Sequence, residues 1–218
     1  MTAATLRPTP SKGLPRWLVP AALIFVSLIP AIFGSLRVAE LAGGSPVTPA
    51  NARFFASPVP VLVHIVGAVV YSLVGAFQFV PRLRVPRRGR AGWHRSAGMV
   101  LVPAGLLVAL SGLWMAAFYD LPEGDGPALF YLRMVFGTGM LVSIILAVRA
   151  LPRHNYRQHG AWMARAYAIG IAAGTQALVS IPWMVVAGQP GETARAVLMG
   201  AGWVINLVVA EYAIRRRA

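Results

Sequence analysis

The sequence predicts an all-α integral membrane protein, a bundle of six transmembrane helices with both termini in the cytoplasm. The 218 residues are 57% hydrophobic and only 12% charged, whereas soluble domains carry about 25% charged residues. The apolar residues fall into six long runs, and a run of about 20 residues is long enough to cross a bilayer. Basic residues gather between alternate runs, which is the positive-inside pattern of membrane topology.

The N-terminal part of the chain predicts a disordered lead followed by the first span. Residues 1–16 are short, polar and rich in proline, so we expect a disordered cytoplasmic segment. The apolar run 17–36 is too long for the core of a signal peptide, and we interpret it as a transmembrane helix. The next segment, 37–58, contains Gly, Ser, Pro and Asn and predicts an external loop.

The other five spans alternate with loops of opposite charge. The segment 81–95 contains arginines and no acid, and the segment 151–160 is also basic, so both are expected in the cytoplasm. Five of the six acidic residues, all except Glu211, fall in segments assigned to the outside. The basic tail 215–218 closes the chain. The single transmembrane domain, 17–214, then has its remaining spans at 59–80, 97–118, 128–150, 161–187 and 194–214.

Composition also excludes several classes of function. Cysteine is absent, which rules out a disulfide framework, thiolate metal sites and a cysteine nucleophile. A net charge of +14 would suit nucleic acid, but the basic residues are spread over short loops rather than gathered on one face. We therefore expect no nucleic-acid partner. Anionic membrane lipids are the expected partners of the arginine loops, and a partner membrane protein is also considered.

Three of the four histidines are expected at the cytoplasmic surface. His94 opens the third span, His154 lies in the loop before the fifth span, and His159 immediately precedes it. Imidazole is a common ligand of zinc, copper and haem iron. One interpretation is therefore a divalent metal site of His94, His159 and His154. Another is a haem b site with His94 and His159 as the ligands, in which Arg95, Arg157 or Arg165 contacts the propionates or lipid phosphates. The alternative is structural, with these side chains contacting lipid headgroups and capping helices.

The fourth histidine, His64, lies near the outer end of the second span. At 1.5 Å per residue it is roughly 20 Å or more from the other three, so it shares no metal ion with them. Arg133 in the fourth span and Gln176 in the fifth are expected in the same outer half. These three residues predict an intramembrane polar cluster, which either binds a solute or only fixes the register of the helices.

An ion pair is predicted near the inner surface. Arg165 lies about one turn inside the fifth span, and Glu211 lies about one turn from the inner end of the sixth. Buried opposite charges pair, so we predict that Arg165 and Glu211 contact each other. The competing interpretation is that each side chain extends separately to the membrane surface.

Three motifs resemble a known family. They are PxxxHIxGAxxYxxxGAFQF from residue 60, WHRSAGMVLV from residue 93 and HxxxxHGAWMARAYA from residue 154. They are similar to a bacterial family of predicted multi-helix membrane proteins, domain of unknown function (DUF) family 2306, over about 59–180. The resemblance implies a multipass protein of the bacterial cytoplasmic (inner) membrane. It implies no reaction, but it points to the residues His64, His94, His159, Trp162, Met163 and Arg165.

Three functions remain open from the sequence. The first is haem or metal binding at the cytoplasmic histidines, in electron transfer or oxidase assembly. The second is a non-catalytic membrane scaffold or partner subunit. The third is a carrier of protons or a small solute that uses His64, Arg133 and Gln176. An enzyme is not the favoured interpretation. A hydrolase is the least favoured, because only six acidic residues exist, five of them in outer segments, and no serine lies in a nucleophile-elbow pattern.

Overall fold

The computed structural model describes residues 17–83, 92–122 and 124–216. Within these ranges every regular element is a helix, so the predicted all-α fold class is confirmed. The predicted disordered lead 1–16, most of the arginine-rich segment 81–95 and the last two residues of the predicted tail lie outside the described residues.

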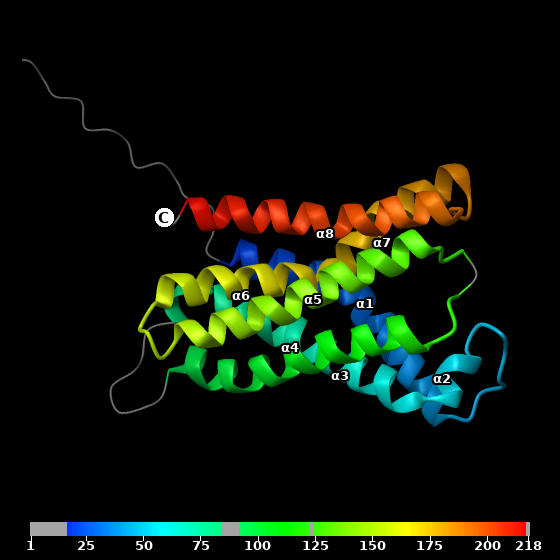
Figure 1. The fold of residues 1–218 in the computed structure, drawn as a ribbon, viewed down its shortest axis with the longest axis horizontal. Helices are drawn as coiled ribbons and strands as arrows, with labels where there is room; N and C mark the ends of the chain where they lie inside the picture. The colour runs from blue at the N-terminus through cyan, green and yellow to red at the C-terminus, as the bar shows by residue number, and fades with distance from the viewer. Residues whose placement is uncertain (1–16, 84–91, 123, 217–218) are drawn as a thin grey trace, which may run out of the picture.

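The helices form an elongated bundle (Figure 1). Among the described residues, five helices are long and apolar enough to cross a membrane alone, and the bent pair α6–α7 adds a sixth crossing if it is counted as one span. In chain order the elements are α1 (Leu18–Ala42), α2 (Ala52–Ala56), α3 (Pro58–Ala76), η1 (Phe77–Phe79), η2 (Pro81–Leu83), α4 (Trp93–Phe118), α5 (Pro127–Ala150), α6 (Tyr156–Gly170), α7 (Ala172–Ala187) and α8 (Glu192–Arg215).

The two ends of the bundle differ in character. One end holds α2, the α4–α5 loop and the α7–α8 turn, and it carries Glu40, Asp125 and Glu192; we call it the outer end. The opposite end, which we call the inner end, holds the α5–α6 loop, the start of α1 and the end of α8 (Figure 1). Both described chain ends therefore lie at the same end of the bundle. That this end faces the cytoplasm stays a prediction of the charge pattern.

Aromatic rings and glycines fill the centre of the bundle. Tyr71 of α3 is 2% exposed, and its ring fits between α4 and α6 because each presents a glycine. A β-carbon at Gly105 would lie 2.6 Å from this ring, and one at Gly170 would lie 2.9 Å from it. Tyr167 of α6 donates a 2.6 Å hydrogen bond to the Ser72 carbonyl. Small residues thus allow close helix packing around large side chains.

The predicted span 161–187 is not one straight helix. It is divided between α6 and α7, which meet at Ile171 with a bend of 41°. At the break the Ala168 carbonyl accepts a 3.0 Å hydrogen bond from the Asn206 side chain of α8. Thr175 donates to the same side chain at 2.8 Å. Irregular backbone at membrane depth persists only where protein groups satisfy it or a cavity adjoins it.

The outer end is more helical than the sequence predicts. The first helix continues past residue 36 to Ala42, and Arg37 pairs with Glu40 inside this extension. Asn51 donates a 2.6 Å hydrogen bond to Glu40 and immediately precedes the short helix α2. These polar contacts order a segment in which the sequence pattern shows only loop-forming residues.

Replacement of Gly174 by alanine should separate α7 from α1. A β-carbon at Gly174 would lie 1.8 Å from the Val26 carbonyl oxygen, a contact that only backbone movement can relieve. We expect Gly174→Ala to reduce the free energy of unfolding by roughly 1–3 kcal/mol, the usual effect of overpacking. The measurement is the thermal midpoint in detergent. Gly98→Ala is the matched control, since no described residue of another helix lies within 4 Å of its β-carbon. Equal midpoints for the two variants would contradict this packing.

Candidate functional site

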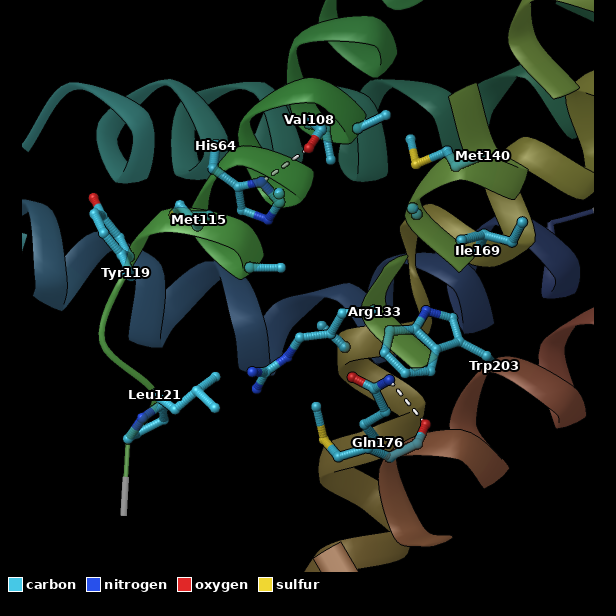
Figure 2. Close-up of a pocket in the computed structure, with 18 of the residues that line it drawn as sticks. His64, Val108, Met115, Tyr119, Leu121, Arg133, Met140, Ile169, Gln176 and Trp203 are labelled. Atoms are coloured by element: carbon cyan, nitrogen blue, oxygen red, sulfur yellow. Dashed lines mark hydrogen bonds between the residues drawn. The ribbon is translucent and has the colours of Figure 1, made fainter. Parts of the chain in front are cut away.

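A cavity of about 340 Å³ opens at the outer end of the bundle. Residues of α3, α4, α5, α6, α7 and α8 line it (Figure 2). The three residues of the predicted polar cluster, His64, Arg133 and Gln176, all lie on its walls. Each of these three side chains pairs with a different partner and not with the other two. The three therefore lie around the open space of the cavity. The rest of the lining is mostly apolar and includes Val108, Ala109, Met115, Ala116, Leu121, Met140, Ile169, Met199 and Trp203.

His64 presents a defined ring nitrogen to the cavity. Its Nδ1 lies 3.1 Å from the Val108 carbonyl oxygen and 3.1 Å from the Ser111 hydroxyl oxygen. A carbonyl oxygen only accepts, so in the neutral ring Nδ1 carries the proton and Nε2 keeps its lone pair. Figure 2 shows the ring edge opposite Val108 facing the cavity. Gly112 makes room for the ring, since a β-carbon there would lie 3.2 Å from it.

Gln176 is held in place by α8. Only 6% of this residue is exposed, and its side-chain nitrogen donates a 2.9 Å hydrogen bond to the Met199 carbonyl. Gly202 permits this approach, because a β-carbon there would lie 2.4 Å from the Gln176 side chain. In Figure 2 the amide oxygen of Gln176 lies toward the cavity. The residue therefore offers the cavity an oriented hydrogen-bond acceptor.

Arg133 pairs with a buried carboxylate whose part in the site could not be predicted from the sequence. Its guanidinium lies 2.6 Å from Asp125, whose side chain is completely buried. Arg195 of α8 contacts the same carboxylate at 2.5 Å. Asp125 thus joins α5 to α8 at the outer end, and two guanidinium groups compensate one carboxylate. Loop residues of the same composition are ordinarily solvated, so no sequence signal showed that Asp125 would turn inward.

Residues of α2 and of the segment that follows α4 also line the cavity, among them Arg53, Tyr119 and Asp120. The Tyr119 hydroxyl donates a 2.5 Å hydrogen bond to the Ser57 carbonyl, which ties the end of α4 to the start of α3. Burial raises the pKa of Tyr119, so the phenol stays neutral at physiological pH. Side chains of both charges therefore line this part of the cavity.

Trp203 forms a flat wall that the sequence analysis also missed. Its indole stacks on Phe136 of α5, with ring centroids 4.7 Å apart and planes inclined by 14°, and it lines the cavity. Aromatic residues are common in transmembrane helices, and the periodicity of α8 does not distinguish Trp203 from its lipid-facing neighbours. The contact depends on how α8 packs against α5.

The inner histidines do not assemble as the predicted metal site. Among the described residues, no group of three His, Cys, Asp or Glu side chains is placed to hold a metal ion. His154 belongs to an exposed turn, with a φ of 53°. The His159 ring donates to the Ala147 carbonyl at 3.0 Å, and the His94 carbonyl accepts from the Gln78 side chain at 3.3 Å. A two-histidine haem site at this end stays a prediction.

The structure brings Arg165 and Glu211 together. The Nε of Arg165 lies 2.5 Å from one carboxylate oxygen, and its Nη2 lies 3.1 Å from the other. The same guanidinium lies over the Trp162 ring, 4.5 Å from its centroid. A bidentate pair of this kind joins α6 to α8 near the inner end and compensates both charges at membrane depth.

Most of the chain is similar to a family of predicted membrane proteins. A family model described as a predicted membrane protein (DUF2306) matches residues 61–214, from α3 to the end of α8. No curated protein and no solved structure matches the chain.

Mutation of the inner ion pair should reveal its coupling. Arg165→Ala and Glu211→Ala should each reduce stability, since each leaves one partly buried charge without its partner. The double variant should be more stable than the sum of the single effects predicts, by about 1 kcal/mol. Thermal or denaturant unfolding of the four proteins in detergent measures this difference. Strict additivity would show that the two side chains act separately.

Cysteine labelling should show that the cavity is open to outside water. The chain contains no cysteine, so a single introduced thiol reports on one position. Ala173 lines the cavity and is exposed, whereas the adjacent Ala172 is 1% exposed. A membrane-impermeant maleimide added to intact cells should label Ala173→Cys quickly and Ala172→Cys slowly. Labelling of Ala173→Cys only after the membrane is broken would contradict the predicted orientation.

Proposed function

The chain belongs to the DUF2306 family of predicted membrane proteins, and we propose that it is a carrier that binds a small solute in the outer cavity. The observation behind this proposal is that His64, Arg133 and Gln176, which come from α3, α5 and α7, line one cavity. A protein that served only as a scaffold would gain nothing from polar side chains directed at an open space within a membrane bundle. Buried polar residues in membrane spans ordinarily mark a pathway or a site.

The position of the helix break supports a carrier. Ile169, Gly170 and Ala173, which flank the break between α6 and α7, line the cavity. Interrupted helices beside a midplane cavity are a recurrent feature of the binding sites of transporters. The cavity opens toward the outer end, while Tyr71 and Tyr167 fill the bundle beneath it. An opening at this end is what an outward-open state of the proposed carrier requires.

The membrane proposed for the carrier is the bacterial inner membrane. Arginines of the inner end support this proposal, because a membrane leaflet rich in anionic lipid attracts each nearby basic residue by about 1 kcal/mol. The described members of this group are Arg82, Arg95, Arg149, Arg153, Arg157, Arg215 and Arg216.

Native mass spectrometry of the purified protein tests the proposal. The wild-type protein should retain a small molecule, seen as a discrete added mass, when it is released from lipid nanodiscs. His64→Ala and Gln176→Ala should reduce its occupancy at least about tenfold, because each removes a polar contact worth roughly 1–3 kcal/mol. His154→Ala is the matched control, since His154 is exposed and lies in the α5–α6 loop at the inner end of the bundle. Equal occupancy in all four proteins would contradict binding in this cavity.

A further inference from the structure

The polar groups of the cavity restrict the chemistry of its ligand, and this inference rests on the proposed function. The hydrogen bond from His64 Nδ1 to the Val108 carbonyl fixes the tautomer, so Nε2 faces the cavity as an acceptor. The hydrogen bond from the Gln176 nitrogen to the Met199 carbonyl leaves the amide oxygen as a second acceptor. A ligand that satisfies both groups must donate hydrogen bonds.

The charged groups and the hydrogen-bond acceptors of the cavity together favour a neutral ligand. Arg133 lines the cavity in Figure 2, and it shares the buried Asp125 with Arg195, so the two guanidinium groups leave one positive charge in excess. A carboxylate ligand would place its oxygens against the two acceptors, His64 and Gln176. An ammonium ligand would be repelled by Arg133 and by Arg195, which pairs with the same carboxylate. A hydroxyl group avoids both conflicts, since it donates and accepts and carries no charge.

The apolar walls favour a flat ring. Trp203 is stacked face to face on Phe136 at 4.7 Å, and this stack holds the indole in place beside the cavity. Methionine side chains at positions 115, 140 and 199 line other parts of the cavity. Thioethers are polarisable and pack well against aromatic rings, and offset stacking on an indole adds about 0.5–1.5 kcal/mol beyond area burial.

We infer that the ligand is a neutral aromatic alcohol of the phenol or quinol class. One hydroxyl donates to His64 Nε2, the ring lies against Trp203, and a second hydroxyl, where present, donates to the Gln176 amide oxygen. In the bound state each hydroxyl donates a hydrogen bond to a protein acceptor, which the hydrocarbon of the bilayer cannot supply. The selectivity of the cavity then comes from its acceptors, because an analogue without donors leaves both acceptors unpaired.

A series of three probes with the same ring tests this inference. Hydroquinone has two hydroxyl donors, 4-methoxyphenol has one and 1,4-dimethoxybenzene has none, while benzoate serves as an anionic probe. Binding to the full-length protein in detergent is measured by titration calorimetry, with empty micelles subtracted and ascorbate present. Hydroquinone should bind at least about tenfold more tightly than 1,4-dimethoxybenzene, which corresponds to about 1.4 kcal/mol. The monomethyl ether should lie between them.

Two variants test whether the preference for hydroquinone over its dimethyl ether depends on Nε2 of His64. His64→Phe keeps a ring of similar size but removes the acceptor, so hydroquinone and its dimethyl ether should bind with similar affinity. His154→Phe makes the same change at an exposed position and should retain the wild-type preference. A preference that persists in His64→Phe would overturn the assignment of His64, and thermal midpoints show whether each variant is folded.

The outcomes separate this inference from the proposed function. If 1,4-dimethoxybenzene or benzoate binds as tightly as hydroquinone, the ligand class is wrong and the cavity remains a binding site. If no probe binds while Ala173→Cys is still labelled from outside, the ligand class is likewise wrong. If no probe binds and Ala173→Cys is also unlabelled, the open cavity and the proposed function both fail.

Discussion

A polar group within a bilayer is costly unless a protein group or a water-filled cavity satisfies it, and this constraint governs how the helices of this bundle are joined. The helix break is tolerated because Asn206 of α8 donates to the Ala168 carbonyl. The charge of Arg165 is tolerated because Glu211 lies 2.5 Å away. In both cases the partner comes from α8, a helix whose outward face is largely apolar and exposed. The polar contacts of α8 therefore help to fix its position in the bundle.

Glycine determines where these partners can meet. Gly202 lets Gln176 reach the backbone of α8, and Gly112 leaves space for the ring of His64. A side chain at either position would displace the polar residue or the helix that carries it. Polar pairing therefore depends on close approach, because a hydrogen bond between helices forms only where their backbones can come near enough.

Much of the fold, and part of the site, could be predicted from the sequence. Apolar runs of sufficient length predict the spans, and counting residues predicts that His64, Arg133 and Gln176 lie at similar depth, since both depend on rise per residue alone. The break at Ile171 could not be predicted, because no proline marks it and its hydrogen-bond partner is on another helix. Asp125 and Trp203 were missed for a similar reason. Their roles depend on the packing of α5 against α8, which no local pattern of residues encodes.

Behind its inner wall the cavity adjoins the buried side chain of Tyr71. The Tyr71 hydroxyl is buried and has no hydrogen-bond partner among the described residues, a condition that costs about 1–3 kcal/mol. Gly170 lines the cavity and also touches the Tyr71 ring, so this phenol lies directly behind the cavity wall. A carrier has to open this wall to release its ligand inward. The α6–α7 break lies beside Gly170, where the helical hydrogen bonds are already interrupted, so a movement there would disturb few further bonds. If such a movement exposed the Tyr71 hydroxyl to water, it would offset the cost of the unpaired group and so favour a second state of the proposed carrier.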